Sequence, residues 1–319
     1  MILNFKIAGT GAALPENEVT NEALTRLVDT SDEWIQSRTG IKSRRVINGE
    51  SLLDLAADAA KKALLMAKAA IGEIDLIICA TMQADTVTPS LACMVQKRLG
   101  AVCPAFDINA ACTGFVYALD VAAGYFARGR AKKALVIAAE CLSKHVDWED
   151  RGTCVLFGDG AGAVVLEEGD CLLSTTLTAD GNDEALVIAG TQARYPGVKT
   201  ESKKQAIHMN GQEIYKFAVN AITRDVKKVL NEAQIKVEDV KCFFFHQANL
   251  RILEAAAQKL GVAFEKLAVN IQNVGNTSAA SIPILLDEVT RAGTLQKGDV
   301  IVLCAFGGGL TTGAACIRW

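Results

Sequence analysis

The feature that most constrains this sequence is an internal repetition of alternating predicted strands and helices. In the first half, a strand, a helix, a strand, a helix and a strand are predicted at 74–80, 89–99, 104–108, 113–128 and 134–139. The same order returns at 240–245, 249–260, 267–271, 277–292 and 300–305. The two series are offset by about 161 to 166 residues. We therefore predict two copies of one α/β unit, each built around a buried sheet.

This repetition divides the chain into two predicted halves, residues 1–170 and 171–319. A chain of 319 residues is long enough for two domains. Further helices, predicted at 52–70 and 212–233, precede the first strand of each repeated series. The net charge of −3 argues against a dedicated nucleic-acid-binding protein, which would be strongly basic.

The sequence contains ten cysteines, and none of them forms a C-x-x-C pair or a spacing typical of a metal site. The first residues lack the pattern of a signal peptide, and the apolar runs fall far short of the ~20 residues that a membrane helix requires. We therefore expect a cytoplasmic protein with free thiols, no metal and no membrane partner. Most of the cysteines are expected to be small buried hydrophobic residues.

Cys112 differs from the other cysteines because it lies between the strand at 104–108 and the start of the helix at 113–128. Ligands of open α/β sheets bind beyond the carboxyl ends of strands. The unpaired N–H groups at a helix start favour a thiolate. Small neighbouring residues leave room for a substrate. Cys112 is therefore a candidate nucleophile, with an ordinary core cysteine as the alternative.

His246 and Asn276 occupy the corresponding loops of the second copy. His246 directly follows the strand at 240–245, and Asn276 lies in the turn before the helix at 277–292. Taken alone, His246 has a structural interpretation, and Asn276 has one as a helix N-cap. The pseudo-symmetry of the two copies predicts that both lie close to Cys112.

A run of three glycines follows Phe306 and ends at Gly309. Glycines permit tight turns and bring backbone N–H groups close to a bound atom. Such a group is suited to an oxyanion hole beside the N–H of Cys112, and a plain turn is the alternative. Two other glycine patterns, at 9–11 and 158–162, lack the features of a dinucleotide-binding loop.

Six motifs, in order along the chain, resemble those of β-ketoacyl-[acyl-carrier-protein] synthase III. They are DTSDEWI–RTGI (29–41), AACTGF around Cys112, DRGT–LFGDGAGA (150–163), HQANLRI (246–252), GNTSAAS (275–281) and AFGGG (305–309). The resemblance implies the thiolase-like fold, in which duplicated α/β halves form a five-layered αβαβα core. It also implies a homodimer.

The reaction that the resemblance implies begins type II fatty acid synthesis. Cys112 would take a short acyl group from acyl-CoA. Malonyl-[acyl-carrier-protein] would then lose CO2 and attack the acyl-cysteine to give 3-oxoacyl-[acyl-carrier-protein]. His246 and Asn276 would stabilise the malonyl enolate. The backbone N–H groups of Cys112 and Gly309 would hold the other oxyanion, with Phe306 as an apolar wall. CoA thioesters are substrates here, and no cofactor is expected.

The resemblance also assigns binding residues. In the CoA site, the adenine would lie between Trp34 and Arg151, and further contacts would come from Arg38 and Thr39. The pantetheine would lie near Gly211 and Asn249. The acidic carrier protein would meet Arg251, Lys216 and Lys259. From the residues alone, the basic ones form either a solvated surface or a rim that binds phosphate or acid. Gln212 and Tyr215 depart from the Asn and Phe expected near the pantetheine.

In the resembled family, the residue before the Pro-Ser pair at 89–90 reaches across the dimer and forms the floor of the acyl pocket. Members restricted to acetyl groups tend to have Phe there, whereas this chain has Thr88. Because a smaller floor leaves room for extra methylene groups, we expect tolerance of primers longer than acetyl.

Two alternatives remain open. A thiolase-fold protein of another class would be a thioester hydrolase or an acyl-binding scaffold, and the intact Cys-His-Asn set argues against a scaffold. A third interpretation keeps the chemistry and changes the pathway, to starter-unit priming in polyketide or quinolone synthesis.

Overall fold

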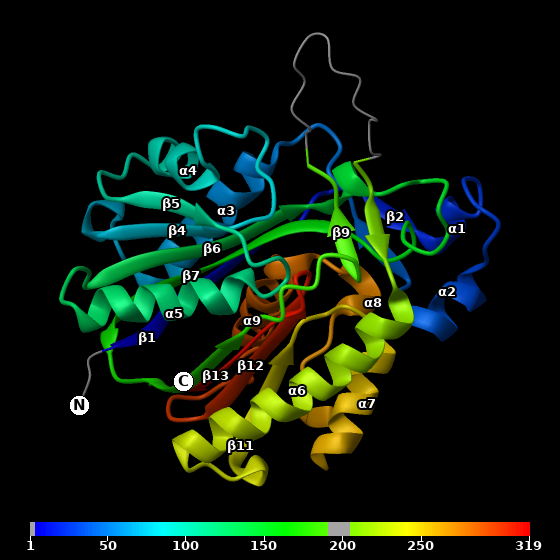
Figure 1. Cartoon of the computed structure of the whole chain (residues 1–319). Coiled ribbons are helices and arrows are strands. Elements are labelled where there is room, and N and C mark those ends of the chain that lie inside the picture. Colours follow the sequence, from blue (N-terminus) through cyan, green and yellow to red (C-terminus); the bar gives the residue numbers. More distant parts are fainter. Residues whose placement is uncertain (1–3, 191–204) are drawn as a thin grey trace.

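The computed structural model describes residues 4–190 and 205–319, whose helices and sheets form five layers (Figure 1). The first sheet has the strand order β1-β7-β6-β4-β5, and the second has the order β8-β13-β12-β11. The first contains β1 (Asn4–Ala13), β4 (Leu76–Ala80), β5 (Ala105–Ile108), β6 (Lys133–Cys141) and β7 (Asp159–Gly169). The second contains β8 (Leu172–Thr178), β11 (Val240–Phe245), β12 (Val300–Gly307) and β13 (Thr311–Arg318).

The four strands of the second sheet repeat the topology of β1, β7, β6 and β4 in the first, as the sequence predicts, and β5 has no counterpart among them. In the first, β4 and β6 are parallel, and β7 is antiparallel to both β6 and β1. In the second, β11 and β12 are parallel, and β13 is antiparallel to both β12 and β8. The strands of the first sheet lie within 4–169 and those of the second within 172–318. The division into domains at residue 170 stays a prediction.

Helices fill the outer and middle layers. On the outer face of the first sheet lie α3 (Leu52–Ala67) and α4 (Leu91–Leu99), and on that of the second lie α6 (Gly211–Ala233) and α7 (Leu250–Leu260). Between the sheets lie α5 (Gly114–Ala127) and α9 (Ser281–Arg291), in one apolar cluster with residues of both sheets (Figure 1). The predicted five-layered αβαβα core is confirmed.

Short elements complete the described part of the chain. They are the helices α1 (Asn21–Leu24), α2 (Asp32–Thr39) and α8 (Ile271–Val274), the 3₁₀ turns Ile71–Glu73, Leu142–His145, Val237–Asp239, Phe264–Lys266 and Ser278–Ala280, and the strand pairs β2 (Glu18–Thr20) with β3 (Ser43–Arg45) and β9 (Leu186–Ile188) with β10 (Ile207–Met209).

Local capping accounts for the accuracy of several predicted helix ends. At α4, the Ser90 side chain accepts a hydrogen bond from the backbone N–H of Cys93, and Gly100 ends the helix in the left-handed region with a φ of 77°. At α7, Asn249 is the N-cap and Gly261 ends the helix in the same way. Side-chain acceptors and glycine are the preferred residues at these positions.

The strand predicted at 267–271 is wrong. Leu267 forms only an isolated bridge with Phe243, and α8 already begins at Ile271. The side chain of Gln247 takes up the backbone groups: it donates to the carbonyl of Ala268 at 3.4 Å and accepts from the N–H of Asn270 at 3.2 Å. The carbonyl of Ala268 and the N–H of Asn270 thus bond to a side chain instead of to a neighbouring strand.

The helix predicted at 277–292 also begins later than expected. Ser278–Ala280 form a 3₁₀ turn, and α9 starts at Ser281. Ser278 has a positive φ of 50°, which is incompatible with a right-handed helix.

Candidate active site

Cys112 lies in the turn between β5 and α5, as the sequence predicts. Thr113 is the N-cap of α5, and the preceding Ala111 has a positive φ of 48°. Such a conformation costs about 1–2 kcal/mol in a non-glycine residue, and it clusters at functional sites. The Cys112 side chain is buried, and its Sγ lies 3.3 Å from Oγ of Ser278.

Burial acts against the thiolate that the helix start is expected to favour at Cys112. Burial raises the pKa of the thiol to about 12; the hydrogen bond from Ser278 lowers this pKa, and the nearby Glu140 carboxylate raises it. Desolvation disfavours the charged form of the sulfur. A thiol with a raised pKa carries a proton that must leave during attack on a thioester.

His246 directly follows β11 and is buried. Its Nδ1 lies 2.7 Å from Oγ of Ser281, which also accepts a long bond of 3.4 Å from the backbone N–H of Gln247. When the Ser281 hydroxyl donates to Nδ1, the ring carries its proton on Nε2. Burial lowers the pKa of His246 to about 3, so the imidazole is neutral at neutral pH.

Asn276 is held on both its backbone and its side chain. Its N–H donates to the carbonyl of Leu156 at 2.9 Å, and its own carbonyl accepts from the N–H of Gly158 at 3.0 Å. Its Oδ1 accepts from the N–H of Ser278 at 2.9 Å. Because Oδ1 is engaged, the Nδ2 hydrogens are the donors that Asn276 offers to a ligand.

Cys112, His246 and Asn276 line one cavity of about 120 Å³. Phe306, the predicted apolar wall, lines it too, and its ring meets His246 edge-on with centroids 5.2 Å apart. Most of the remaining lining is apolar and includes Leu156, Phe157, Leu186, Met209, Ile214, Ala248 and Ile252. The structure thus brings together a thiol from the first half and two donors from the second. Hydrogen bonds from fixed donors are strong in such surroundings.

Gly307 is the glycine that packs directly against the cysteine turn. A Cβ on Gly307 would lie 2.7 Å from the backbone nitrogen of Cys112, so a larger residue requires a shift. Gly309 has a φ of 73° and borders, with Cys112, a second cavity of about 600 Å³. Gly309 was predicted from the sequence and Gly307 was not, because a run of glycines does not reveal which member makes the contact.

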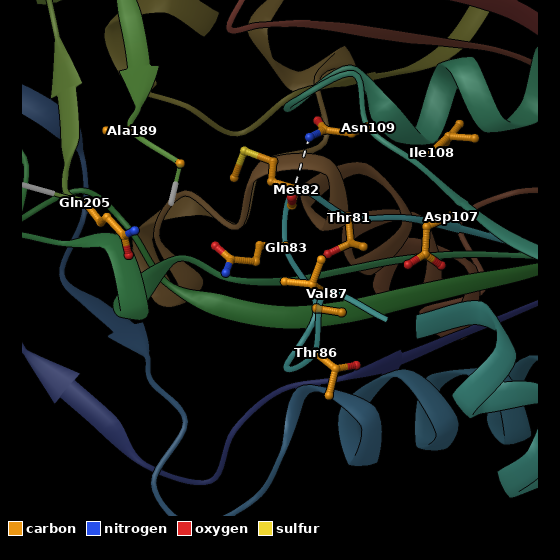
Figure 2. Close-up of a pocket in the computed structure, with 12 residues that line it drawn as sticks. Thr81, Met82, Gln83, Thr86, Val87, Asp107, Ile108, Asn109, Ala189 and Gln205 are labelled. Atoms are coloured by element: carbon orange, nitrogen blue, oxygen red, sulfur yellow. Dashed lines mark hydrogen bonds between the residues drawn. The ribbon is translucent and has the colours of Figure 1, made fainter. Parts of the chain in front are cut away.

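The second cavity extends from Cys112 toward the loop that carries Thr88. Met82, Gln83 and Asn109 border both this cavity and a third one of about 480 Å³ (Figure 2). Thr88 is exposed, and within the described residues it borders neither cavity. Its role as the floor of an acyl pocket in a partner subunit stays a prediction.

Comparison with known proteins shows the family to which a chain with this site belongs. Residues 106–181 match the family described as 3-oxoacyl-[acyl-carrier-protein (ACP)] synthase III, and residues 230–319 match its C-terminal part. Beta-ketoacyl-[acyl-carrier-protein] synthase III of Clostridium acetobutylicum is 47% identical, with 99% of each chain covered. The protein of the same name from Aquifex aeolicus is 48% identical, with 99% of this chain and 100% of that protein covered. The chain belongs to the 3-oxoacyl-[acyl-carrier-protein] synthase III family.

Solved structures agree with this membership. The crystal structure of 3-oxoacyl-[acyl-carrier-protein] synthase III from Aquifex aeolicus has a TM-score of 0.92 and 47% identity, with 99% of this chain and 100% of that chain covered. The priming β-ketosynthase from the R1128 polyketide biosynthetic pathway has the same TM-score of 0.92 at 32% identity, with 99% and 96% covered. The thiolase-like fold predicted from the motifs of synthase III is therefore confirmed.

Trp34 and Arg151, two of the residues predicted to contact CoA, lie against each other. The guanidinium carbon of Arg151 is 4.9 Å from the ring centroid of Trp34, and an Arg151 Nη donates to the carbonyl of Asp29 at 2.9 Å. A base can enter between the two side chains only if they move apart. The adenine sandwich therefore stays a prediction that requires this separation.

The structure separates the other predicted CoA contacts into two groups. Gly211 and Asn249 border the cavity of about 120 Å³, and the amide of Asn249 donates to the carbonyl of Arg38 at 3.1 Å. Thr39 is buried, and its hydroxyl donates to the carbonyl of Ile35 at 2.7 Å. This engaged hydroxyl gives no support to a side-chain contact with CoA.

The three cations predicted to meet the carrier protein are exposed on the outer layer of the second half. Lys216 lies on α6, and Arg251 and Lys259 lie on α7. The two helices pack together, and Lys259 donates to the side chain of Asn220 at 2.7 Å across them. The cations thus share the helix pair that also supplies Gly211 and Asn249.

Several groups around the three central residues were not predicted from the sequence. Besides Gly307, they are Ser278, which contacts Cys112, Ser281, which contacts His246, and Glu140, which contacts Ser278. The two serines lie within the GNTSAAS motif, which identified Asn276 alone. Glu140 was detectable as one acidic residue at the end of an apolar run, VIAAEC.

Metal and membrane features are absent from the described ranges 4–190 and 205–319. No group of three or more His, Cys, Asp or Glu residues there is placed to hold a metal ion. In the same ranges, no helix has the length and apolar character needed to cross a membrane. The ten cysteines are all free thiols.

Proposed function

We propose that this chain transfers an acyl group from acyl-CoA to Cys112 and then condenses it, with decarboxylation, onto malonyl-[acyl-carrier-protein]. The products are 3-oxoacyl-[acyl-carrier-protein], CoA and CO2, and the reaction initiates type II fatty acid synthesis. One observation carries the proposal: a buried thiol and two neutral hydrogen-bond donors line the same apolar cavity.

In the first step, the sulfur of Cys112 attacks the carbonyl carbon of the acyl-CoA. The carbonyl oxygen becomes an oxyanion, which needs donors that are in place before the reaction. The backbone N–H of Cys112 and that of Gly309 are the proposed donors. Expulsion of CoA leaves a covalent thioester on Cys112.

In the second step, the malonyl thioester oxygen takes the place between Nε2 of His246 and Nδ2 of Asn276. Loss of CO2 places negative charge on this oxygen, and the two donors stabilise the resulting enolate. A neutral imidazole suffices because decarboxylation generates the carbanion without a base. The apolar ring of Phe306 disfavours the malonyl carboxylate relative to neutral CO2.

The residues around the cavity and the exposed cations support the proposed binding partners. We assign CoA contacts to Trp34, Arg151, Arg38 and Thr39. We assign pantetheine contacts to Gly211 and Asn249. The acidic carrier protein is assigned to Lys216, Arg251 and Lys259. The cations suit an acidic surface because complementary charge steers association. The chemistry needs no cofactor, since both acyl groups arrive as thioesters. We further propose a cytoplasmic location, which the free thiols support.

We also propose a homodimer. β5 lies at the edge of the first sheet, and within the described residues it pairs only with β4. The loops on either side of α4 carry Val87, which is 94% exposed, and Val102, which is 97% exposed. An unpaired strand edge beside exposed apolar side chains favours association with a second copy.

Substitution of the nucleophile tests the proposal. The wild-type protein, mixed with acetyl-CoA, should gain one acetyl group by intact mass, and it should form 3-oxoacyl product when malonyl-[acyl-carrier-protein] is added. Cys112→Ser should lose the covalent acyl group, whereas the control Cys103→Ser, at a half-buried thiol, should retain it. Wild-type stoichiometry of acylation in Cys112→Ser would contradict the assignment.

The same assay separates the alternatives. A thioester hydrolase would release free acid without a condensed product, and an acyl-binding scaffold would form neither. A priming enzyme of a polyketide or quinolone pathway would condense, but with a carrier protein or starter unit of that pathway in preference to acetyl-CoA and the fatty acid carrier.

A further inference from the structure

Glu140 is a buried acid that the proposed steps leave unused. It lies near the end of β6, and only 1% of it is exposed. Its carboxylate accepts from the backbone N–H of Met82 at 3.1 Å and contacts Oγ of Thr81 at 3.5 Å. Among the ion pairs of the described residues, none involves Glu140. A carboxylate without a cation is costly to bury, so its presence calls for a specific role.

Ser278 connects this acid to the nucleophile. Its hydroxyl oxygen lies 3.2 Å from Oε1 of Glu140 and 3.3 Å from Sγ of Cys112. The residue is buried, has a φ of 50°, and is held by the bond from its N–H to Oδ1 of Asn276. Two groups from separate segments, the carboxyl of Glu140 and the thiol of Cys112, thus meet at one hydroxyl.

A hydroxyl has one hydrogen, so it donates to one of these neighbours and accepts from the other. When the thiol is protonated and the acid is ionised, Cys112 donates to Oγ of Ser278, and the Ser278 hydroxyl donates to the Glu140 carboxylate. When the sulfur is a thiolate and the acid is protonated, Glu140 donates to Oγ of Ser278, and the Ser278 hydroxyl donates to the sulfur. The same contacts therefore serve the site before and after a proton transfer.

We propose that Ser278 and Glu140 form a relay that takes the thiol proton of Cys112 during acylation and returns it after condensation. This inference rests on the proposed function. It assigns Ser278 as the group in contact with the reacting sulfur and Glu140 as a positioning and proton-storing residue that acts through it.

The protons and electrons balance across the two steps. As Sγ forms its bond to the acyl carbon, its proton passes to Oγ of Ser278, and the serine proton passes to Oε1 of Glu140. The bond from the acyl carbon to the CoA sulfur breaks, and CoA leaves as a thiolate that takes a proton from water. In the condensation, the Cys112 thiolate is the leaving group, and it recovers its proton from Glu140 through Ser278.

The acidities of the groups fit a proton that leaves only as sulfur bonds to carbon, because the pKa of the resting Cys112 thiol, raised by burial to about 12, lies above that of Glu140. Burial raises the pKa of Glu140 to about 8, so the side chain can both accept and release a proton near neutral pH. The buried imidazole of His246 has its pKa lowered to about 3 and is a poor base for this purpose. Thr81, Ser278 and the backbone N–H groups of Met82 and Ala279 are the hydrogen-bonding groups at the Glu140 carboxylate, and the neighbouring titratable group is Cys112.

The test measures two properties of Glu140→Gln and Ser278→Ala: the single-turnover rate of acetyl transfer from acetyl-CoA, and the pH dependence of Cys112 alkylation by iodoacetamide. We expect both variants to slow acylation by about 10²–10⁴, the usual contribution of general base catalysis. The wild-type alkylation rate should rise through a step near the ionisation of Glu140, and this step should disappear in both variants. Glu140→Asp, which keeps a carboxylate, should restore part of the acylation rate and the step.

Asp159→Asn is the matched control. It neutralises another buried carboxylate, which lies on the neighbouring strand β7 and bonds to Ser143 rather than to Ser278 or Cys112. Thermal melting of each variant identifies loss of fold. We expect Asp159→Asn to keep the wild-type alkylation profile.

Wild-type acylation and an unchanged alkylation profile in folded Glu140→Gln would overturn the relay. If Glu140→Gln does not fold, the same result in Ser278→Ala overturns it. A wild-type protein that never acquires an acyl group would contradict the proposed function instead. The alkylation profile would still test the relay in that case, since it requires no thioester.

Discussion

At the scale of single residues, burial decides which protonation state each group of the site presents. It raises the pKa of Cys112 and of Glu140 and lowers that of His246. One physical cause, the loss of water around a charge, thus leaves the thiol protonated and the imidazole neutral. A neutral donor is the form suited to an enolate.

We predict that His246→Ala and Asn276→Ala impair decarboxylation more than acylation. Each substitution removes one donor to the enolate, a loss expected to be about 10²–10³ in rate. Acetyl transfer to Cys112 should survive in both variants, because Ser278 is the residue that hydrogen-bonds to the sulfur. Release of CO2 from labelled malonyl-[acyl-carrier-protein] and intact mass measure the two steps separately. Equal loss of both steps would show that these residues chiefly activate the thiol.

At the scale of elements, the site depends on how closely two strand ends approach each other. The turn after β5 carries Cys112, and the end of β12 carries Gly307, whose backbone leaves no room for a side chain. The contact joins the two halves of the chain, so the position of the nucleophile depends on the packing of both sheets.

We predict that Gly307→Ala slows acylation at least tenfold, because its Cβ would meet the backbone nitrogen of Cys112 at 2.7 Å and displace the turn. The control is Gly124→Ala in α5, where a Cβ meets nothing within 4 Å. This control should leave acylation unchanged and stabilise the helix by about 0.5–1 kcal/mol. Single-turnover acylation and thermal melting of both variants check the pair. Wild-type acylation in Gly307→Ala would show that the turn adapts.

The loop that carries Thr88 is the element expected to set primer length. We predict activity with primers longer than acetyl, since each additional buried methylene contributes about 0.8 kcal/mol. Thr88→Phe should lower kcat/KM for butyryl-, isobutyryl- and octanoyl-CoA more than for acetyl-CoA, and the isosteric Thr88→Val should not. A preference for acetyl-CoA in the wild type, unchanged in Thr88→Phe, would place the floor elsewhere.

At the scale of the whole molecule, the buried acid next to the site links the stability of the fold to pH. The pKa of Glu140 is raised by burial to about 8, so the folded protein binds this proton more tightly than the unfolded chain does. The resulting stability is complete below the ordinary pKa of a glutamate. It is lost as the pH rises toward about 8.

We predict that Glu140→Gln, which has no charge to bury, becomes more stable relative to wild type as the pH rises from about 5 to about 8. The difference should grow by up to about 1.4 kcal/mol per pH unit. Urea unfolding of both proteins across this range measures it. A constant difference would mean that the folded protein does not hold the Glu140 proton more tightly than the unfolded chain does.

The sequence by itself determined the order of the elements and the residues that begin and end several of them. Periodicity, Ser90 and Gly100 define α4 locally, and the repeated order of strands and helices sufficed to predict that Cys112, His246 and Asn276 converge. These features depend on neighbours in the chain or on the topology that the repetition imposes.

Only the tertiary structure decided the remaining features, because each depends on groups far apart in the sequence. The segment 267–271 does not form the predicted strand, because the side chain of Gln247 bonds to its backbone groups. The fold buries the thiol of Cys112, which raises its pKa, and it places Glu140 against Ser278, which in turn contacts the sulfur. Burial and long-range hydrogen bonds have no local periodicity, so they became visible only when the two halves packed together.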